Sequence, residues 1–361
     1  MGLRVVVMAG GTGGHIFPAL AVAKILQVQG ATITWLGSEQ GMETDLVPKS
    51  GFPIEVLSVK GLRGNGLRGW LVAPFRVSKA IWQAWIVLRR LQPQVVLGLG
   101  GFVSGPGGVA AKLLRVPLVI HEQNAVAGMT NRWLAKMATA VFYAFPQAFS
   151  DKAQNPKFRL CGNPVRQDIV QTLKPESRFQ DRQGALRILV LGGSLGALVL
   201  NDVVPAALGE LKHSGVEYVV RHQAGVRTLQ AAQAAYEQSQ VTAEISAFVE
   251  DMASAYAWAD LVICRAGALT IAELSAVGVA AILVPYAHAV DDHQTGNARY
   301  LSDPGAAILI PQTEFSAHKL VSVLSELNRH KLQEMAQRSR ALAVVDAAER
   351  VAEYCLQVGK S

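Results

Sequence analysis

The stretch Val5-Val6-Val7-Met8-Ala9-Gly10-Gly11-Thr12-Gly13-Gly14-His15 indicates the fold of the chain. A β-branched run leads directly into four glycines, and an apolar helical pattern follows over residues 16–26. This order predicts a buried strand, a tight turn and a helix. The glycines let the backbone approach a ligand, and the N–H groups at the helix start attract negative charge. The turn is therefore either an anion site, with Thr12 and His15 at its mouth, or an ordinary βα turn.

The composition indicates two globular domains with large cores. The chain has 361 residues, of which 50% are hydrophobic and only 17% are charged, which excludes a disordered chain. Cys161, Cys264 and Cys355 are far apart, a pattern typical of a reduced, cytosolic protein without structural zinc. The N-terminus enters a strand at once, so we expect no secretory signal. Glycines and a proline interrupt the charge-free residues 93–111, so we expect no transmembrane helix there.

Basic residues are concentrated in the first half. Residues 1–160 contain 17 lysines and arginines against 6 acidic residues, whereas residues 161–361 contain 17 against 21. Between Glu55 and Glu122 there is no acidic residue, but there are nine basic ones. Such a patch is suited to nucleic acid, to an anionic membrane or to a phosphorylated substrate.

The opening pattern recurs in the second half, where a strand over residues 188–191 leads into Gly192-Gly193-Ser194-Leu195-Gly196-Ala197. Strands and helices alternate in both halves, so the sequence predicts an α/β fold of two Rossmann-like domains that face each other across a cleft. The expected limits are 1–163 and 164–335, with a last helical segment, 336–361, that packs back on the first domain. Residues 141–145 are expected to close the first sheet, and residues 167–186 are expected to form a polar linker.

Residues 60–91 suggest contact with a membrane. Residues 64–69 match the dinucleotide-binding pattern of glycines, but the acidic residue that this pattern needs is missing, so we interpret 61–69 as a mobile cationic loop. In the helix expected over 70–91, aromatic and basic residues alternate, as at the headgroup boundary of a bilayer. The alternative is a core helix whose aromatic residues face the sheet. The candidate contacts are the apolar Leu71, Phe75, Trp82 and Trp85 and the basic Arg63, Arg68, Arg76, Lys79, Arg89 and Arg90.

Two further stretches carry candidate chemistry. His121-Glu122-Gln123-Asn124 ends a predicted strand, where ligands bind in open α/β sheets, although Glu122 could simply pair with an arginine. Gly267-Ala268-Leu269-Thr270 begins a predicted helix, and Glu273, one turn later, is placed to accept hydrogen bonds from ribose hydroxyls. The chain has no P-loop, no ligand cluster at metal spacing and no Asp-x-Asp pair. Backbone N–H groups and helix dipoles would therefore neutralise a bound pyrophosphate without a metal ion.

Taken together and in order, six motifs resemble the MurG family of peptidoglycan glycosyltransferases. They are Gly10-Gly11-Thr12-Gly13-Gly14-His15, His121-Glu122-Gln123-Asn124, Gly162-Asn163-Pro164-Val165-Arg166, Gly192-Gly193-Ser194-Leu195-Gly196-Ala197, Arg265-Ala266-Gly267-Ala268-Leu269-Thr270, and Asp292-His293-Gln294 through Asn297-Ala298. The resemblance implies a GT-B fold with UDP-N-acetylglucosamine held mostly by the second domain. It also implies an inverting transfer to the 4-hydroxyl of the muramyl sugar of lipid I, which yields lipid II and UDP.

The resemblance also implies site residues, partners and a location. The substrate-binding residues that it implies are Thr12, Gly13, Gly14, Asn124, Arg166, Ser194, Val249, Ala268, Leu269, Thr270, Ile271, Ala272, Glu273 and Gln294. The expected partners are UDP-N-acetylglucosamine, lipid I and an anionic membrane surface, with no nucleic acid, no cofactor and no metal. The expected location is the cytoplasmic face of the plasma (inner) membrane, as a peripheral protein.

The residues leave open both the identity of the base and the function. A direct displacement needs one base near the acceptor hydroxyl, and both His15 and Glu122 are candidates, with His15 slightly favoured. A transferase that acts on another lipid such as diacylglycerol, or a nucleotide-sugar epimerase, would share the fold. A nucleic-acid-binding module is a more distant alternative, because the aromatic residues are not arranged for base stacking.

Overall fold

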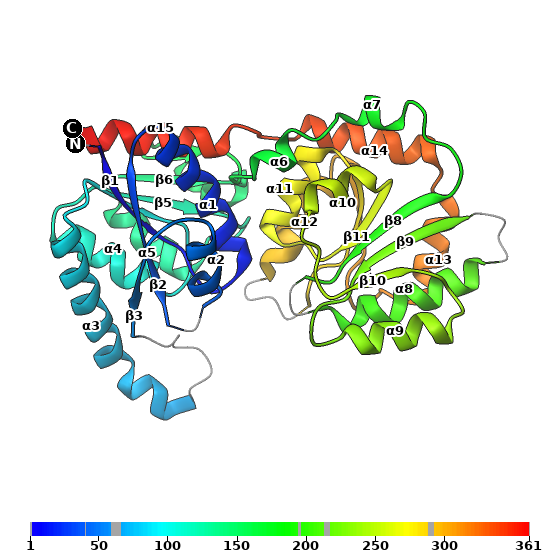
Figure 1. Cartoon of the computed structure of the whole chain (residues 1–361), viewed down its shortest axis with the longest axis horizontal. Coiled ribbons are helices and arrows are strands. Elements are labelled where there is room, and N and C mark those ends of the chain that lie inside the picture. Colours follow the sequence, from blue (N-terminus) through cyan, green and yellow to red (C-terminus); the bar gives the residue numbers. More distant parts are fainter. Residues whose placement is uncertain are drawn as a thin grey trace. The chain divides into compact units, whose positions relative to one another are not determined.

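The fold consists of two compact units, seen in a computed structural model that describes residues 2–39, 41–58, 66–193, 196–212, 217–287 and 292–360, with backbone alone for 66–73. The first unit comprises residues 1–166 and 345–361, and the second comprises residues 167–344. Both ends of the chain lie in the first unit (Figure 1). The boundary at the end of the second unit lies after residue 344, later than the expected 335/336. The reason is that helix α14 (Arg329–Ala341) is continuous and packs within the second unit.

The first unit contains a seven-stranded parallel sheet in the order β3-β2-β1-β4-β5-β6-β7. Its strands are β1 (Arg4–Met8), β2 (Thr32–Ser38), β3 (Ile54–Leu57), β4 (Val95–Gly98), β5 (Leu118–Glu122), β6 (Ala140–Tyr143) and β7 (Phe158–Leu160). Its helices are α1 (Gly13–Val28), α2 (Glu43–Lys49), α3 (Gly66–Leu91), α4 (Ser104–Leu113), α5 (Met129–Met137), the 3-10 helix η1 (Pro146–Lys152) and α15 (Ala347–Lys360). The prediction that residues 141–145 close the sheet is wrong, because β7, a short strand with two exposed residues, lies beyond β6.

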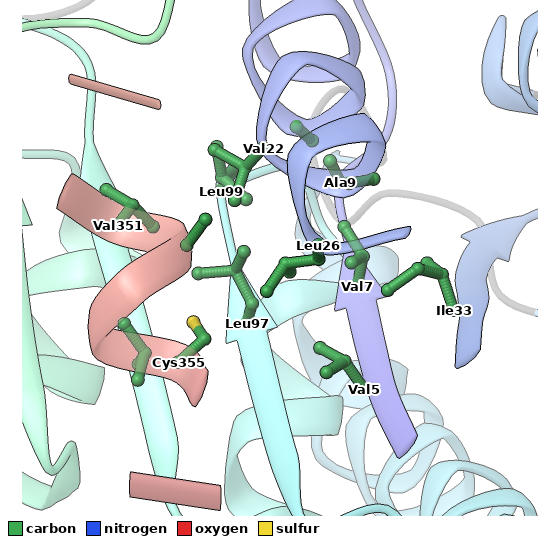
Figure 2. Close-up of a cluster of buried hydrophobic side chains, with 14 of the residues drawn as sticks. Val5, Val7, Ala9, Val22, Leu26, Ile33, Leu97, Leu99, Val351 and Cys355 are labelled. Atoms are coloured by element: carbon green, nitrogen blue, oxygen red, sulfur yellow. The ribbon is translucent and has the colours of Figure 1, made fainter. Parts of the chain in front are cut away.

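The first sheet is covered on both faces, as a parallel sheet requires. On one face, α1 and α15 pack over the centre, and Val351 and Cys355 of α15 lie beside Leu97 and Leu99 near β4 (Figure 2). The other face carries residues of α3, α4 and α5. The last helix of the chain therefore completes the core that the first strand begins.

The second unit repeats this architecture with a six-stranded parallel sheet in the order β10-β9-β8-β11-β12-β13. Its strands are β8 (Leu186–Leu191), β9 (Tyr218–Gln223), β10 (Glu244–Ser246), β11 (Leu261–Cys264), β12 (Ala280–Leu283) and β13 (Ala307–Leu309). Its helices are α6 (Gln167–Val170), α7 (Pro175–Phe179), α8 (Leu198–Leu211), α9 (Leu229–Gln238), α10 (Met252–Trp258), α11 (Ala268–Val277), α12 (His293–Ser302), α13 (Ala317–Glu326) and α14.

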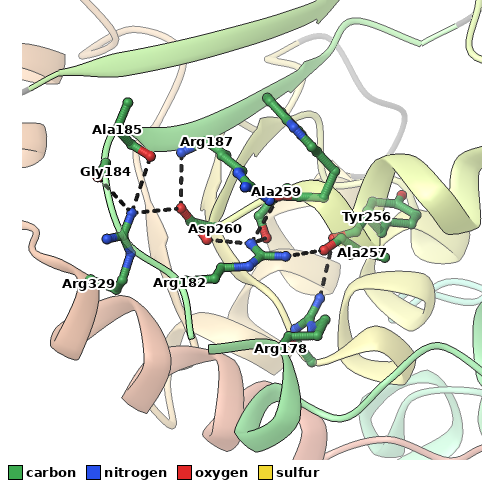
Figure 3. A network of polar contacts seen from close by, with 12 residues as sticks. Arg178, Arg182, Gly184, Ala185, Arg187, Tyr256, Ala257, Ala259, Asp260 and Arg329 are labelled. Carbon is green, nitrogen blue, oxygen red and sulfur yellow. Dashed lines mark hydrogen bonds and ion pairs between the residues drawn. The ribbon is translucent and has the colours of Figure 1, made fainter. Parts of the chain in front are cut away.

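The expected linker at 167–186 is wrong, because this segment contains α6 and α7 and carries part of a buried polar network (Figure 3). Asp260, just before β11, is fully buried and pairs with Arg182 and, at 3.5 Å, with Arg329. Arg182 also donates to carbonyls at the end of α10, while Arg178 donates to Tyr256 and Gly278. The segment is therefore tied to the amino end of β11 and to α10.

Candidate active site

The first unit has its topological switch point between β1 and β4, where open α/β sheets bind ligands. The glycine turn 10–14 follows β1, and a second glycine turn follows β4. The two turns touch, because a side chain at Gly101 would strike the Gly10 carbonyl oxygen. Gly100 and Gly101 have positive φ angles of 107° and 80°, so glycine is required at both positions.

His15 lies where these two turns meet. A Cβ atom at Gly100 would come within 2.6 Å of its Nδ1 atom, so the imidazole packs directly on the second turn. Burial lowers the pKa of His15 below 6.5, although Glu122, the Gln123 side chain, the Leu99 carbonyl and Glu43 each oppose this shift. His15 is therefore neutral at pH 7, the form that a general base requires.

Glu122 is buried and its carboxylate is occupied by neutral donors. Oε1 accepts hydrogen bonds from the backbone N and the Nδ2 of Asn124, at 2.9 and 3.3 Å. Oε2 accepts from the Gly128 backbone N at 3.0 Å and from Asn131 Nδ2 at 2.8 Å. The partners of Glu122 are thus amide groups rather than the arginine that the simpler interpretation proposed. The carboxylate holds the turn that carries Asn124.

The neighbouring polar residues are structural. His121 Nε2 lies 2.9 Å from the Gly162 carbonyl oxygen, and burial lowers the pKa of His121 to about 4. Gln123 donates to the Leu99 carbonyl, and Asn163 donates to the Gln123 carbonyl at 3.0 Å. These bonds tie the end of β5 to the turn after β4 and to the residues that leave β7.

Sequence reasoning missed Glu43, the first residue of α2. Its side chain is fully buried, and Oε2 accepts a hydrogen bond from the Gly11 backbone N at 2.9 Å. Oε1 accepts from the backbone N and the Oγ of Ser38, at 2.9 and 2.7 Å. Only the pairing of β1 with β2 brings Glu43 to the glycine turn, so no local sequence signal identifies it.

The predicted binding residues of the first unit lie around the start of α1. Thr12 is the N-cap residue, but its hydroxyl makes no capping hydrogen bond. Gly13 and Gly14 form the first turn, whose N–H groups have no partner within the helix. The Arg166 guanidinium lies 5.2 Å from the ring centre of Phe17, and Arg166 belongs to the first unit rather than to the second domain as expected.

The second unit has its switch point between β8 and β11. Helix α11 follows β11 and begins at Ala268, and its N-cap residue Gly267 has no side chain to bind the first N–H groups. The first turn of α11 thus offers donors to an anion. The predicted residues 268–273 all lie in the first two turns of this helix, where Leu269, Thr270 and Ala272 are partly exposed.

Glu273 is buried in α11, and its Oε2 accepts a hydrogen bond from the hydroxyl of Tyr256 at 3.0 Å. Tyr256 lies on α10, the helix whose end Arg178 and Arg182 hold. Gln294 lies at the start of α12, and its Oε1 accepts from the Tyr286 backbone N at 2.9 Å.

Two predicted residues remain, Val249 and Ser194. Val249 is half-buried in the turn between β10 and α10. Ser194 lies outside the described residues, as do Arg63 and the side chains of Arg68 and Leu71.

Helix α3 divides its apolar residues between two faces. Ala80, Ala84 and Leu88 are buried in the core, whereas Phe75 is 74% exposed and Trp82 is 61% exposed. Trp85 packs partly against the core, with the Arg89 guanidinium 5.0 Å from its ring centre. The exposed basic residues of this part of the helix are Lys79, Arg89 and Arg90.

The described ranges contain neither a candidate metal site nor a candidate membrane span. Within them, no group of three or more His, Cys, Asp or Glu side chains is placed to hold a metal ion. No helix traced there is both long and apolar enough to cross a bilayer.

Comparison with known proteins identifies the family. The glycosyltransferase family 28 N-terminal domain matches residues 5–143, and the family 28 C-terminal domain matches residues 187–351. The chain is 54% identical over 359 residues, 99% of each chain, to the UDP-N-acetylglucosamine--N-acetylmuramyl-(pentapeptide) pyrophosphoryl-undecaprenol N-acetylglucosamine transferase of Alkalilimnicola ehrlichii. It is 51% identical to the protein of the same name from Marinobacter nauticus, over 98% of this chain and 97% of that one.

A solved structure agrees with the sequence relatives. The crystal structure of MurG from Acinetobacter baumannii has a TM-score of 0.84 and 41% identity, and the match covers 98% of this chain and 99% of that one. The two parallel-sheet units are those of a GT-B fold. The chain belongs to glycosyltransferase family 28 and is a glycosyltransferase of the MurG type.

Proposed function

We propose that the chain transfers N-acetylglucosamine from UDP-N-acetylglucosamine to the 4-hydroxyl of the muramyl sugar of lipid I, with inversion and without a metal ion. The names of its relatives support the two substrates. The observation that carries the mechanism is the neutral imidazole of His15, placed where the two glycine turns of the first unit meet.

In this mechanism His15, and not Glu122, takes the proton. The acceptor oxygen attacks C1 of the sugar as its proton passes to the imidazole, the bond from C1 to the pyrophosphate oxygen breaks, and UDP leaves from the opposite face. The four donors on Glu122 occupy the carboxylate lone pairs that a base would need. Glu122 instead holds Asn124 and stabilises the imidazolium that forms.

The donor part of the proposal rests on α11. The amino end of this helix carries no side-chain cap and would stabilise the negative charge that develops on the departing UDP, which supports a reaction without a divalent cation. Glu273 is the proposed ribose ligand, and its bond to Tyr256 fixes the orientation of its carboxylate.

The test is UDP release and sugar transfer by purified protein, with and without a short-chain lipid I analogue and with excess EDTA. We expect disaccharide formation only with the acceptor, with inverted configuration and undiminished by EDTA. Conversion of UDP-N-acetylglucosamine without an acceptor would indicate an epimerase, and a reversible loss of turnover in EDTA would contradict the metal-free mechanism.

We further propose that the exposed face of α3 binds an anionic membrane. Phe75, Lys79, Trp82 and Ile86 are spaced so that they share one face of the helix, and all four are exposed. A polyprenyl-linked acceptor stays in the bilayer, so the enzyme must come to it. Each basic residue near such a surface contributes about 1 kcal/mol, an attraction that salt weakens.

Co-sedimentation with anionic and neutral vesicles tests this proposal. We expect binding to anionic vesicles that falls steeply with salt, and loss of that binding in a Phe75→Ser/Trp82→Ser double variant. The variant should still turn over a short-chain, water-soluble acceptor. Unchanged sedimentation of the double variant would mean that another surface binds the membrane.

A further inference from the structure

The buried carboxylate of Glu43 has no counter-charge among the described residues. It accepts three hydrogen bonds, one from Gly11 and two from Ser38, and no basic nitrogen of the described chain forms an ion pair with it. Removing an ionised carboxylate from water is costly unless it is paired, and neutral donors compensate only in part. No ion pair in the described chain therefore accounts for the charge.

Three glycines leave room for this carboxylate. A Cβ atom at Gly10 would lie 2.5 Å from Oε1, and one at Gly37 would lie 2.8 Å from Cγ. A Cβ atom at Gly41 would overlap Oε2. These glycines come from the turn after β1, from β2 and from the turn before α2, so three separate segments accommodate one side chain.

We propose that Glu43 is a positioning residue for the transfer, which holds the glycine turn to β2 through Gly11 and so sets the place of Thr12 and His15. Gly11 has a φ of 91°, and its N–H group points back to the carboxylate. Gly11, Thr12 and Gly14 are exposed. The turn is thus held by a buried hydrogen bond to Glu43 while these three residues remain exposed. This inference rests on the proposed role of His15.

Glu43 also acts on His15 through its charge. The charged and polar groups that face the imidazole are Glu122, Gln123, the Leu99 carbonyl and Glu43, and each raises the pKa of His15 against the larger effect of burial. The imidazole becomes cationic when it takes the acceptor proton. Two fixed carboxylates, one from the end of β5 and one from α2, stabilise that cation without moving.

The decisive variant is Glu43→Gln, which keeps the shape and removes the charge. We expect kcat to fall by about tenfold or more, the effect of losing a charge-assisted hydrogen bond. We also expect the acidic limb of the kcat/KM profile to move to lower pH, because His15 loses one of the charges that favour its protonated form. UDP affinity, measured by calorimetry, should not change, because α11 belongs to the other unit.

Asp45→Asn is the matched control, since Asp45 lies on the same short helix but is exposed. It should change neither kcat nor the pH profile. A merely structural role of Glu43 predicts lower activity at every pH with an unmoved acidic limb, and that result overturns the inference. His15→Asn separates the two proposals, because full activity of that variant defeats the proposed base itself.

A second variant covers the case in which Glu43→Gln does not fold. Gly10→Ala keeps Glu43 but displaces it, because the three atoms nearest the new Cβ are all in the Glu43 carboxyl group. The titration of His15 is then followed by NMR of labelled histidine. A lower pKa of His15 supports the inference, and an unchanged pKa contradicts it.

Discussion

The buried carboxylates of the first unit and Asp260 of the second unit lie at different edges of similar sheets. In the first unit, Glu43 and Glu122 lie beside the turns after β1 and β5, at the carboxyl edge, and accept hydrogen bonds from neutral groups. In the second unit, Asp260 lies just before β11, at the amino edge, and is paired with arginines. Ligands bind at the carboxyl edge, so a charge there is available to the reaction.

The consequence is that similar buried acids have different roles. The Asp260 charge is cancelled by Arg182 and Arg329, and its effect is confined to the structure of the second unit. The charges of Glu43 and Glu122 are not cancelled by cations in the described chain, and both reach His15. The comparison predicts that removing the charge of Asp260 lowers the stability of the fold. Removing the charge of Glu43 or Glu122 should instead lower catalytic activity.

The largest effect is expected at His15. His15→Ala removes the proposed base and should lower kcat by about 10²–10⁴-fold, the range for general base catalysis. Turnover of the acceptor analogue is the measurement. If Glu122→Gln proved more damaging to kcat than His15→Ala, the proposed assignment of the base would be wrong.

Asp260→Asn should act on stability instead. It leaves Arg182 beside a neutral group in the interior, and breaking a buried pair costs about 3–5 kcal/mol. Denaturant unfolding measures this loss, and kcat at a temperature where the variant is folded should be near that of the parent. Glu244→Gln, in an exposed pair with Arg221, is the control and should unfold like the parent. An Asp260→Asn variant that is as stable as the parent but inactive would contradict the structural role assigned to Asp260.

Glu273 tests the donor side of the second unit. Glu273→Ala should raise the KM for UDP-N-acetylglucosamine by an amount equivalent to about 1.5–3 kcal/mol, through loss of a charge-assisted bond to ribose. Tyr256→Phe should raise the same KM by a smaller factor, because it removes one hydrogen bond that orients the carboxylate but keeps the carboxylate itself. The KM for the acceptor should be unchanged in both. An unchanged donor KM in Glu273→Ala would exclude the ribose contact.

The pH dependence of stability should be alike in the two units. Burial lowers the pKa of His121 and of His222 to about 4, from 6.5. The unfolded chain therefore binds more protons than the folded one between pH 6.5 and 4, and stability falls as the pH falls through this window. Each histidine should remove about 2 kcal/mol between pH 7 and 5. Urea unfolding at both pH values should show this loss, and His222→Gln should reduce it.

The sequence predicts much of the fold, because strands, glycine turns and helices each leave a pattern within a few neighbouring residues. The βα units opened by Val5–His15 and by residues 188–197, and the open start of α11, follow from strand, glycine and helix patterns. Glu43 and Tyr256 are different, since each contacts its partner only after strands or helices distant in sequence have paired. Residues 158–160 and 307–309 are too short to show a strand pattern, and the polar segment 167–186 contains two helices, the buried Arg178 and the partly buried Arg182.

The position of α15 has a consequence for synthesis on the ribosome. Ala348, Val351, Ala352 and Cys355 belong to the core of the first unit, yet they are translated after all of the second unit. The second unit is continuous in sequence and can complete its core during translation. The first 166 residues must wait, with the face over β4 uncovered, until α15 emerges. We therefore expect the nascent chain to acquire protease resistance in the second unit before the first, the reverse of the usual order from the N-terminus.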